Sequence, residues 1–182
     1  MLKTILLSLL GLVAVGIVVV LILAARKPDT FQVTRSIKID ATPERIYPLI
    51  ADFRAWGAWS PWEKKDPAMK RSFSGPDSGV GASYGWEGDK NVGTGKMTIL
   101  EATPSHKVVI KLEFLKPFEA TNTAEFTLQP VGDSTAIVWA MYGKNNFLSK
   151  LVCVFMDMEK MVGPDFEAGL AGLKALAEKP AA

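Results

Sequence analysis

The chain has 182 residues, with 21 Lys and Arg against 19 Asp and Glu, so the formal net charge is only +2. Basic and acidic residues are interspersed, which argues against the continuous basic surface that nucleic-acid binding requires. The single cysteine, Cys153, excludes an internal disulfide and a multi-cysteine metal site.

The N-terminal segment predicts a membrane anchor. Residues 4–25 carry no charge and are rich in Leu, Val and Ile. As a helix rising about 1.5 Å per residue, this run would extend roughly 33 Å, enough to cross the hydrocarbon core of a bilayer. A cleaved secretory signal is the alternative, but the run is longer than a typical signal core and no small-x-small pair ends it. We therefore predict an anchor and its flank over residues 1–27 and a globular domain over residues 28–182.

The charged residues on the two sides of this run favour opposite orientations in the membrane. Lys3 favours an N-terminus inside the cell, because positively charged flanks stay on the cytoplasmic side. Arg26, Lys27, Arg35 and Lys38 follow the run and favour the reverse. The side of the membrane that carries the globular domain therefore stays open.

The globular part begins with a strand and a short helix. Residues 31–39 alternate apolar and polar side chains, as a half-buried strand does, except that Arg35 stands on the apolar face. Thr42-Pro43-Glu44 then supplies an N-cap, a proline at the first helical position and an acid in the first turn. Apolar residues at helical spacing continue to Phe53.

Three tryptophans follow at three-residue intervals, Trp56, Trp59 and Trp62. This spacing aligns the rings on one side of a tight helical turn. The segment fits a hydrophobic lid over the core, a wall of a ligand pocket, or an interfacial membrane contact. It also fits an exposed patch that docks a protein partner.

Residues 69–142 repeat short alternating runs separated by turn signals such as Gly75-Pro76-Asp77. With the first strand they predict about seven strands, which short turns would join in antiparallel order. The last run, residues 135–142, is apolar on both faces, so its periodicity does not tell which face points inward.

Residues 146–178 carry a stripe of apolar side chains at steps of three and four, typical of an amphipathic helix or of two helices in series. Gly163-Pro164 interrupts the stripe, so we expect a kink or a restart there. A sheet with one apolar face needs a cover, and this is the only long helix left to provide it. The predicted fold is therefore α+β, a curved antiparallel sheet of about seven strands wrapped around a long C-terminal helix.

Several segments carry a resemblance to a known family, namely residues 36–44, 52–62, 84–88, 92–95, 156–160 and 165–170. On these segments, and over roughly residues 31–178, the chain resembles the START-like superfamily, also called SRPBCC, whose helix-grip fold is shared with plant pollen allergens and polyketide cyclases. It is most similar to membrane-anchored bacterial proteins labelled polyketide cyclase or dehydrase. The resemblance implies an apolar or amphipathic ligand between the sheet and the long helix, catalysis in only some members, and the bacterial inner membrane as the location.

Few residues suggest catalysis. The one histidine, His106, lies in a polar turn, whereas a catalytic base needs a partner and a cleft. The carboxylates lack metal-ligand spacing, and Gly93-x-Gly95 lacks the rest of a phosphate-binding loop. We therefore predict no catalytic residue, no metal and no cofactor.

The predicted ligand site is a cavity between the sheet and the long helix, because concave apolar sites with few polar groups are the usual ligand sites. Asn122 stands on the apolar face of its strand, where its amide needs backbone, water or a ligand as a hydrogen-bond partner. Each candidate taken alone also fits ordinary core packing. The candidate ligand-binding residues are Tyr84, Trp86, Met97, Phe114, Asn122, Phe126, Trp139, Phe155, Met158 and Phe166.

Three functions stay open. The first is a membrane-anchored, non-catalytic binding or carrier domain for a hydrophobic or lipid-like small molecule. The second is a cyclase/dehydratase-like enzyme for a polyketide-like substrate, with Tyr84, Asn122 or Tyr142 donating hydrogen bonds toward a developing enolate. The third is a ligand-free interaction module that docks a protein through residues 56–62. A cavity whose one polar group is Asn122 would favour binding, whereas a paired titratable group with a displaced pKa would favour an enzyme.

Overall fold

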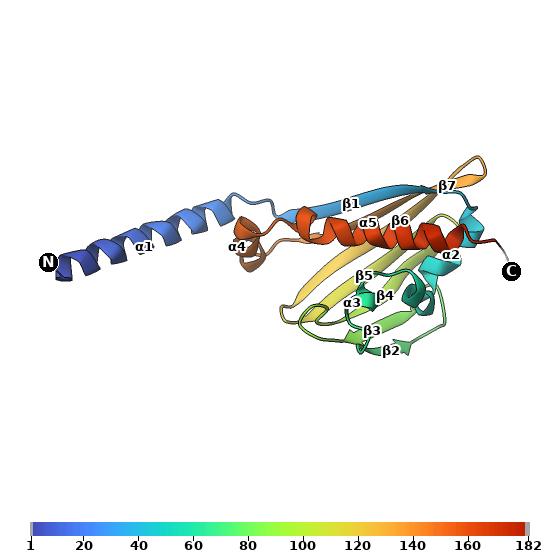
Figure 1. The fold of residues 1–182 in the computed structure, drawn as a ribbon, viewed down its shortest axis with the longest axis horizontal. Coiled ribbons are helices and arrows are strands. Elements are labelled where there is room, and N and C mark those ends of the chain that lie inside the picture. The colour runs from blue at the N-terminus through green and yellow to red at the C-terminus, as the bar shows by residue number, and fades with distance from the viewer. Residues whose placement is uncertain (1, 181–182) are drawn as a thin grey trace.

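The computed structural model describes residues 2–180. A long N-terminal helix, α1 (Leu2–Ala25), projects from one end of a domain built on a single curved sheet (Figure 1). The strands are β1 (Thr30–Ile39), β2 (Lys70–Ser74), β3 (Ser83–Glu87), β4 (Thr94–Thr103), β5 (Lys107–Lys116), β6 (Ala120–Val131) and β7 (Ser134–Lys144). The remaining helices are α2 (Pro43–Ala51), the 3-10 helix η1 (Phe53–Ala58), α3 (Trp62–Lys65), α4 (Phe147–Phe155) and α5 (Met158–Ala177).

The seven strands pair antiparallel in the order β1-β7-β6-β5-β4-β3-β2. Helix α5 runs along the inner face of this sheet, close to β1, while α2, η1 and α3 lie over the β2–β5 side (Figure 1). The predicted α+β helix-grip fold is confirmed.

The inner face of the sheet is apolar because alternate residues of each strand point toward α5. On β6 these are Ala124, Phe126 and Leu128, as the sequence predicted. On β7, whose periodicity left the question open, Ile137 and Trp139 are buried and therefore face inward.

The C-terminal stretch forms two helices, but the break between them differs from the prediction. The chain becomes extended at Met156, with φ −125° and ψ 135°, and Asp157 then caps α5 by accepting a hydrogen bond from the backbone N–H of Glu159 at 3.0 Å. Pro164 lies inside α5, where it cannot donate a hydrogen bond to the carbonyl of Lys160, yet the helix continues through it to Ala177. The expected restart at Gly163-Pro164 is therefore wrong, because the capping aspartate starts the helix earlier.

Gly163 has a packing role within α5. Arg35, which interrupts the apolar pattern of β1, points toward this helix, and its guanidinium occupies the space that a side chain at position 163 would fill. It donates hydrogen bonds to Glu159 and Glu167 at 2.7 Å each. The unexpected charge on the apolar face of β1 thus joins the edge strand to α5.

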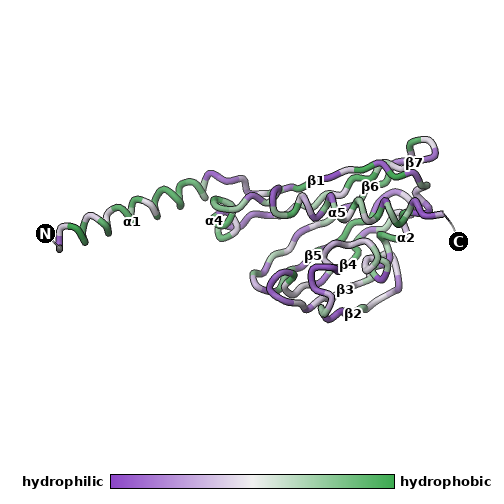
Figure 2. Tube along the Cα trace, in the orientation of Figure 1, coloured by the Kyte–Doolittle hydropathy of each residue, from purple (hydrophilic) through white to green (hydrophobic). Residues whose placement is uncertain are grey.

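Helix α1 is apolar along its length (Figure 2). Lys3–Ala25 is long and apolar enough to cross a membrane, and its most apolar 18-residue stretch is not buried inside the protein, although a signal sequence has the same properties. The last turn of α1 contacts α4, where Ala24 is fully buried.

We expect Leu173→Ala to lower the free energy of unfolding by about 2–5 kcal/mol, because this α5 side chain is fully buried between the helix and the sheet. Leu100→Ala, at a leucine that is 53 % exposed on β4, is the control and should change stability by less than about 0.5 kcal/mol. Urea denaturation followed by tryptophan fluorescence measures both. Equal effects of the two substitutions would contradict the packing described for α5.

Candidate ligand-binding site

A cavity of about 460 Å³ lies between the inner face of the sheet, the η1–α3 segment and the first half of α5. Its wall is mainly apolar and aromatic, and it reaches from β3 across to β7. It is lined by Trp56, Ser60, Trp62, Glu63, Lys65, Met69, Tyr84, Trp86, Asn91, Val92, Met97, Leu112, Phe114, Asn122, Ala124, Trp139, Met141, Met158, Met161, Val162, Asp165 and Phe166.

Most of the residues selected from the sequence meet at this cavity. Two do not line it. Phe126 is fully buried behind Trp139, with the two ring centroids 4.7 Å apart. Phe155 is 75 % exposed on α4, because the break at Met156-Asp157 separates its helix from α5. The residues that do line the cavity are Tyr84, Trp86, Met97, Phe114, Asn122, Trp139, Met158 and Phe166.

Trp139 lies at the centre of an aromatic cluster that connects the sheet to α5. Its ring stacks on Phe166 with 4.0 Å between centroids and 8° between planes. Trp62 meets both rings edge to face, at 5.8 Å and 6.1 Å. Aromatic pairs in these geometries stabilise a fold by more than the burial of their apolar surface alone. This cluster therefore fixes α5 over β7.

The indole N–H of Trp139 has no acceptor. Across residues 2–180 it is the one buried side-chain nitrogen or oxygen without a hydrogen-bond partner. The other buried tryptophans are satisfied, since Trp56 donates to the carbonyl of Ile50 at 3.0 Å and Trp59 to that of Leu49 at 2.9 Å. A buried donor left unpaired costs about 1–3 kcal/mol, and Trp139 is one of the residues that line the cavity.

The tryptophan segment does not form the exposed patch that a docking role requires. Trp56 and Trp59 are only 4 % and 1 % exposed, because their rings pack into the core and their N–H groups bond to the end of α2. Trp56 and Trp62 also line the cavity. The segment therefore combines two of the predicted roles, a lid on the core and a wall of the pocket.

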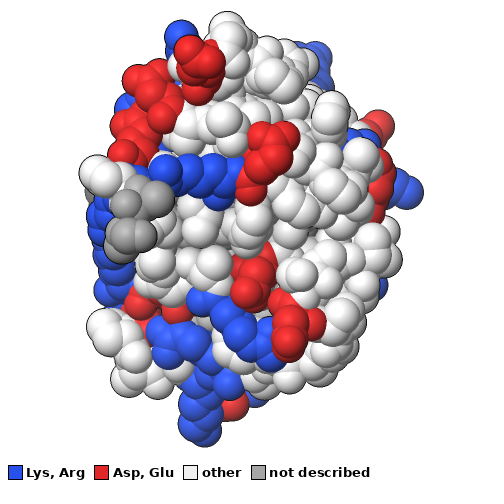
Figure 3. Space-filling model, turned by 90° about the vertical axis from the view of Figure 1, so that its right-hand side faces the viewer, with Lys and Arg blue, Asp and Glu red and all other residues white. Residues whose placement is uncertain are grey.

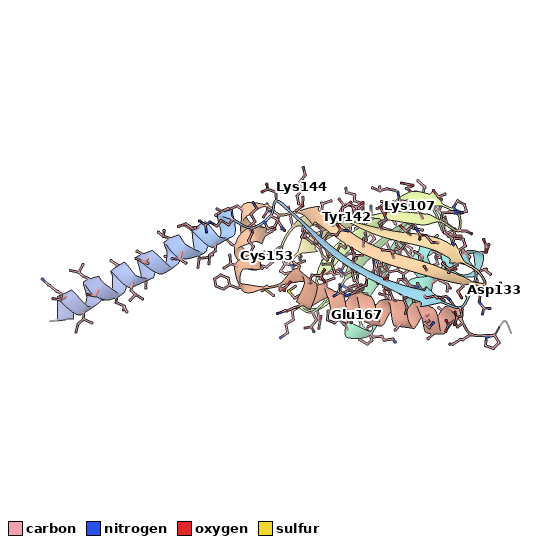
Figure 4. All side chains as sticks on the ribbon, turned by 90° about the horizontal axis from the view of Figure 1, so that it is seen from above. Lys107, Asp133, Tyr142, Lys144, Cys153 and Glu167 are labelled. Carbon is pink, nitrogen blue, oxygen red and sulfur yellow. The ribbon has the colours of Figure 1, made fainter. Side chains whose placement is uncertain are left out.

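Asn122 provides a polar group on the β6 wall. Its side chain is buried and occupies the space above Gly143 on the neighbouring strand, where any side chain would collide with its amide oxygen. Tyr142, the next residue on β7, points to the opposite face, where it lies near Lys107 (Figure 4) and donates a hydrogen bond to Glu125 at 3.2 Å. The expectation that Tyr142 acts on a ligand in the cavity is therefore wrong, since the side chains of a strand alternate.

A carboxylate lies beside Tyr84 at the cavity wall. The Tyr84 hydroxyl donates to Glu63 at 2.5 Å, and Arg71 donates to the other oxygen of Glu63 at 2.6 Å. Burial, and then the adjacent Glu63 carboxylate, raise the pKa of Tyr84 well above its usual value near 10. Tyr84 is therefore a neutral hydrogen-bond donor at physiological pH.

Sequence reasoning did not select Glu63 or Arg71 for this site. Glu63 comes from α3 and Arg71 from β2, and their pairing depends on how α3 packs over the sheet. The position of Glu63 immediately after Trp62, which faces the cavity, was the only local signal. A second ion pair, between Lys65 and Asp165 at 2.6 Å, joins α3 to α5 beside the cavity.

The remaining titratable side chains offer little reactive chemistry at the cavity. His106 is exposed in the β4–β5 turn, where its ring Nδ1 lies 3.0 Å from the carbonyl of Pro104. Within residues 2–180, no group of three His, Cys, Asp or Glu side chains is arranged to hold a metal ion. The polar groups at the cavity are therefore hydrogen-bonding and paired ionic side chains.

Comparison with known proteins identifies a family. Residues 30–178 match the model of the family described as polyketide cyclase / dehydrase and lipid transport. No curated protein sequence matches the chain significantly.

Solved structures of similar fold are distant in sequence. Protein CV1439 of Chromobacterium violaceum superposes with a TM-score of 0.59 at 18 % identity, covering 84 % of this chain and 99 % of that one. The di-domain ARO/CYC protein BexL of the BE-7585A biosynthetic pathway has a TM-score of 0.60 at 16 % identity, covering 87 % and 53 %. Ginseng major latex-like protein 151 of Panax ginseng has a TM-score of 0.57 at 12 % identity, covering 84 % and 100 %. These likenesses establish the fold.

We expect the Tyr84 hydroxyl to stay protonated at a pH at which a free tyrosine ionises. An alkaline titration followed by tyrosinate absorbance should then give nearly the same curve for the native protein and Tyr84→Phe up to about pH 11. Above about pH 10 the unfolded chain releases the Tyr84 proton, whereas the folded protein keeps it. The contribution of Tyr84 to the free energy of unfolding should therefore fall as the pH rises above about 10. If Tyr84→Phe removes a full ionisation step near pH 10, the assigned environment of Tyr84 is incorrect.

Proposed function

This chain belongs to the polyketide cyclase / dehydrase and lipid transport family, and from that premise we propose that its domain binds or carries a hydrophobic small molecule in the cavity between the sheet and α5. The observation that carries the proposal is the cavity itself, whose volume of about 460 Å³ lies within the usual range for small-molecule sites. Its aromatic and aliphatic wall favours an apolar body for the ligand. The proposed role is binding without catalysis.

The polar groups of the cavity suggest what else the ligand carries. Lys65, which lines the cavity, is paired with Asp165, and Arg71, which lies behind the lining residue Glu63, is paired with that carboxylate. An ionic headgroup would have to break one of these pairs. The unpaired indole N–H of Trp139, in contrast, needs an acceptor. We therefore propose an uncharged ligand with a carbonyl, hydroxyl or ether oxygen close to Trp139.

The proposed setting is a membrane, with α1 as a single-pass anchor and residues 28–182 as the domain that it carries. The core cluster of buried apolar residues contains no residue of α1, which supports separate folding of this domain. The exposed apolar surface of α1 would be covered by lipid. A bacterial inner membrane is the proposed location.

Catalysis is a second candidate because of one specific group of residues. Glu63, Tyr84 and Arg71 form a hydrogen-bonded array at the cavity wall, and the raised pKa of Tyr84 is the kind of displacement that active sites show. In a cyclase or dehydratase, Tyr84 would donate to a developing enolate while Glu63 received a proton. Both oxygens of Glu63 are already occupied, which is why we rank binding first.

A matched pair of probes tests the role of Trp139. 2-Acetylnaphthalene and 2-ethylnaphthalene are similar in shape, but only the ketone has an acceptor oxygen. The preference for the ketone is the ratio of the dissociation constants of the two probes. We expect Trp139→Phe to reduce this ratio by about 2- to 12-fold, because the loss of one hydrogen bond costs about 0.5–1.5 kcal/mol. Fluorescence titration or calorimetry measures the four dissociation constants.

Trp59→Phe is the control for this cycle. Its indole N–H donates to the Leu49 carbonyl, and Trp59 does not line the cavity. This substitution should lower stability and leave the ratio of the two affinities unchanged. If Trp139→Phe leaves that ratio unchanged while both probes bind, the indole does not recognise the ligand; if neither probe binds the native protein, the proposed cavity function fails.

A further inference from the structure

One end of the domain collects several segments that are far apart in the sequence. Antiparallel pairing places Thr30 opposite Lys144 and Thr94 opposite Lys116. The start of β1, which follows α1, therefore lies at the same end of the sheet as the β3–β4 loop, the β5–β6 turn and α4 (Figure 1). We call this the α1 end of the domain.

The α1 end is unusually apolar. Outside α1, and among the residues that the structure describes, thirteen large hydrophobic side chains are exposed, and eight of them lie at this end. The opposite end carries Lys and Arg interspersed with Asp and Glu (Figure 3). The eight are Leu115, Phe118, Phe147, Leu148, Val152, Phe155, Met156 and Met161.

Helix α4 contributes most of this surface. It is nine residues long, is predominantly apolar (Figure 2), and has no buried residue. It contacts α1 directly. It is also held to the segment between α1 and β1, because Lys150 forms an ion pair with Asp29 and the backbone N–H of Asn145 donates to the Asp29 carbonyl at 2.8 Å. The exposed apolar side of α4 is therefore held beside the end of α1.

The length of α1 sets the depth of α4 in a membrane. With 24 residues, α1 is about 36 Å long, slightly more than a hydrocarbon core of about 30 Å. Its last turn, at Ala24, then lies where the hydrocarbon core ends, and α4 packs against this turn. Helix α4 is thus placed at the boundary between the acyl chains and the headgroups.

We propose that α4 and the β5–β6 turn lie in the surface of the same bilayer that α1 crosses. An apolar helix face at this depth is stabilised by burial among the upper acyl chains. The cavity wall is close to α4 in the sequence, since only two residues separate the end of α4 from Met158, and both Met158 and Met161 line the cavity. Resting on the proposed binding function, this arrangement opens the cavity toward the membrane, so that an apolar ligand passes between bilayer and cavity without crossing water.

Depth-dependent quenching tests the proposal on the full chain. The native cysteine is removed by Cys153→Ser, and Phe155→Cys carries an environment-sensitive fluorophore after reconstitution into phosphatidylcholine vesicles. Lipids with a spin label on the acyl chain should quench this fluorophore several-fold more strongly than one at Asp133→Cys, in the β6–β7 turn at the opposite end (Figure 4). Aqueous iodide should quench them in the reverse order.

Phe118→Cys in the β5–β6 turn provides a second position, which keeps the test valid if labelling at 155 disturbs α4. Quenching of both positions by iodide and not by spin-labelled lipid would overturn the proposal. Protection of both from iodide and lipid alike would also overturn it, because another protein surface would then cover them. The readout needs no bound ligand, so a positive result remains valid even if the probes of the preceding section do not bind.

Discussion

The structure depends on how one helix covers a sheet that is wider than the helix. Trp139 stacks on Phe166 at 4.0 Å, and Arg35 reaches Glu159 and Glu167, so α5 is fixed over β1 and β7. The β3–β5 side is left for η1 and α3 to cover. These short helices close over the sheet through the buried rings of Trp56 and Trp59, and the space that remains between them and α5 is the cavity.

The same packing determines the chemistry of the cavity. Most polar groups around it are paired with one another, as in the Lys65–Asp165 bridge and the array of Glu63, Tyr84 and Arg71. The stack that fixes α5 buries the indole of Trp139 without giving its N–H an acceptor. A mainly apolar wall with an unpaired, fully buried indole N–H is suited to an uncharged ligand with an oxygen atom, and this favours binding over reaction.

Much of the fold was predictable because strand alternation is a local signal. The inward residues of β6, including Asn122, follow directly from the period of two. The face of β7 was not predictable, since both of its sides are apolar. The break at Met156-Asp157 was not predicted either, because Gly163-Pro164 was the more obvious helix-breaking signal, whereas α5 begins after the Asp157 cap and continues through Pro164. Eight cavity residues were selected from the sequence because aromatic and other inward-facing side chains of the strands converge with the apolar face of α5. Glu63 was missed because its contacts arise only from tertiary packing.

The most direct test of the central claim is native mass spectrometry of residues 27–182, expressed without α1 and purified without detergent. If the cavity binds a ligand, the spectrum should show a reproducible additional mass, which denaturation releases as an uncharged, apolar molecule that contains oxygen. The bare chain mass in preparations from several expression hosts, unchanged after incubation with a lipid extract, would contradict it. In that case the cavity would be a packing feature of the fold and not a ligand site.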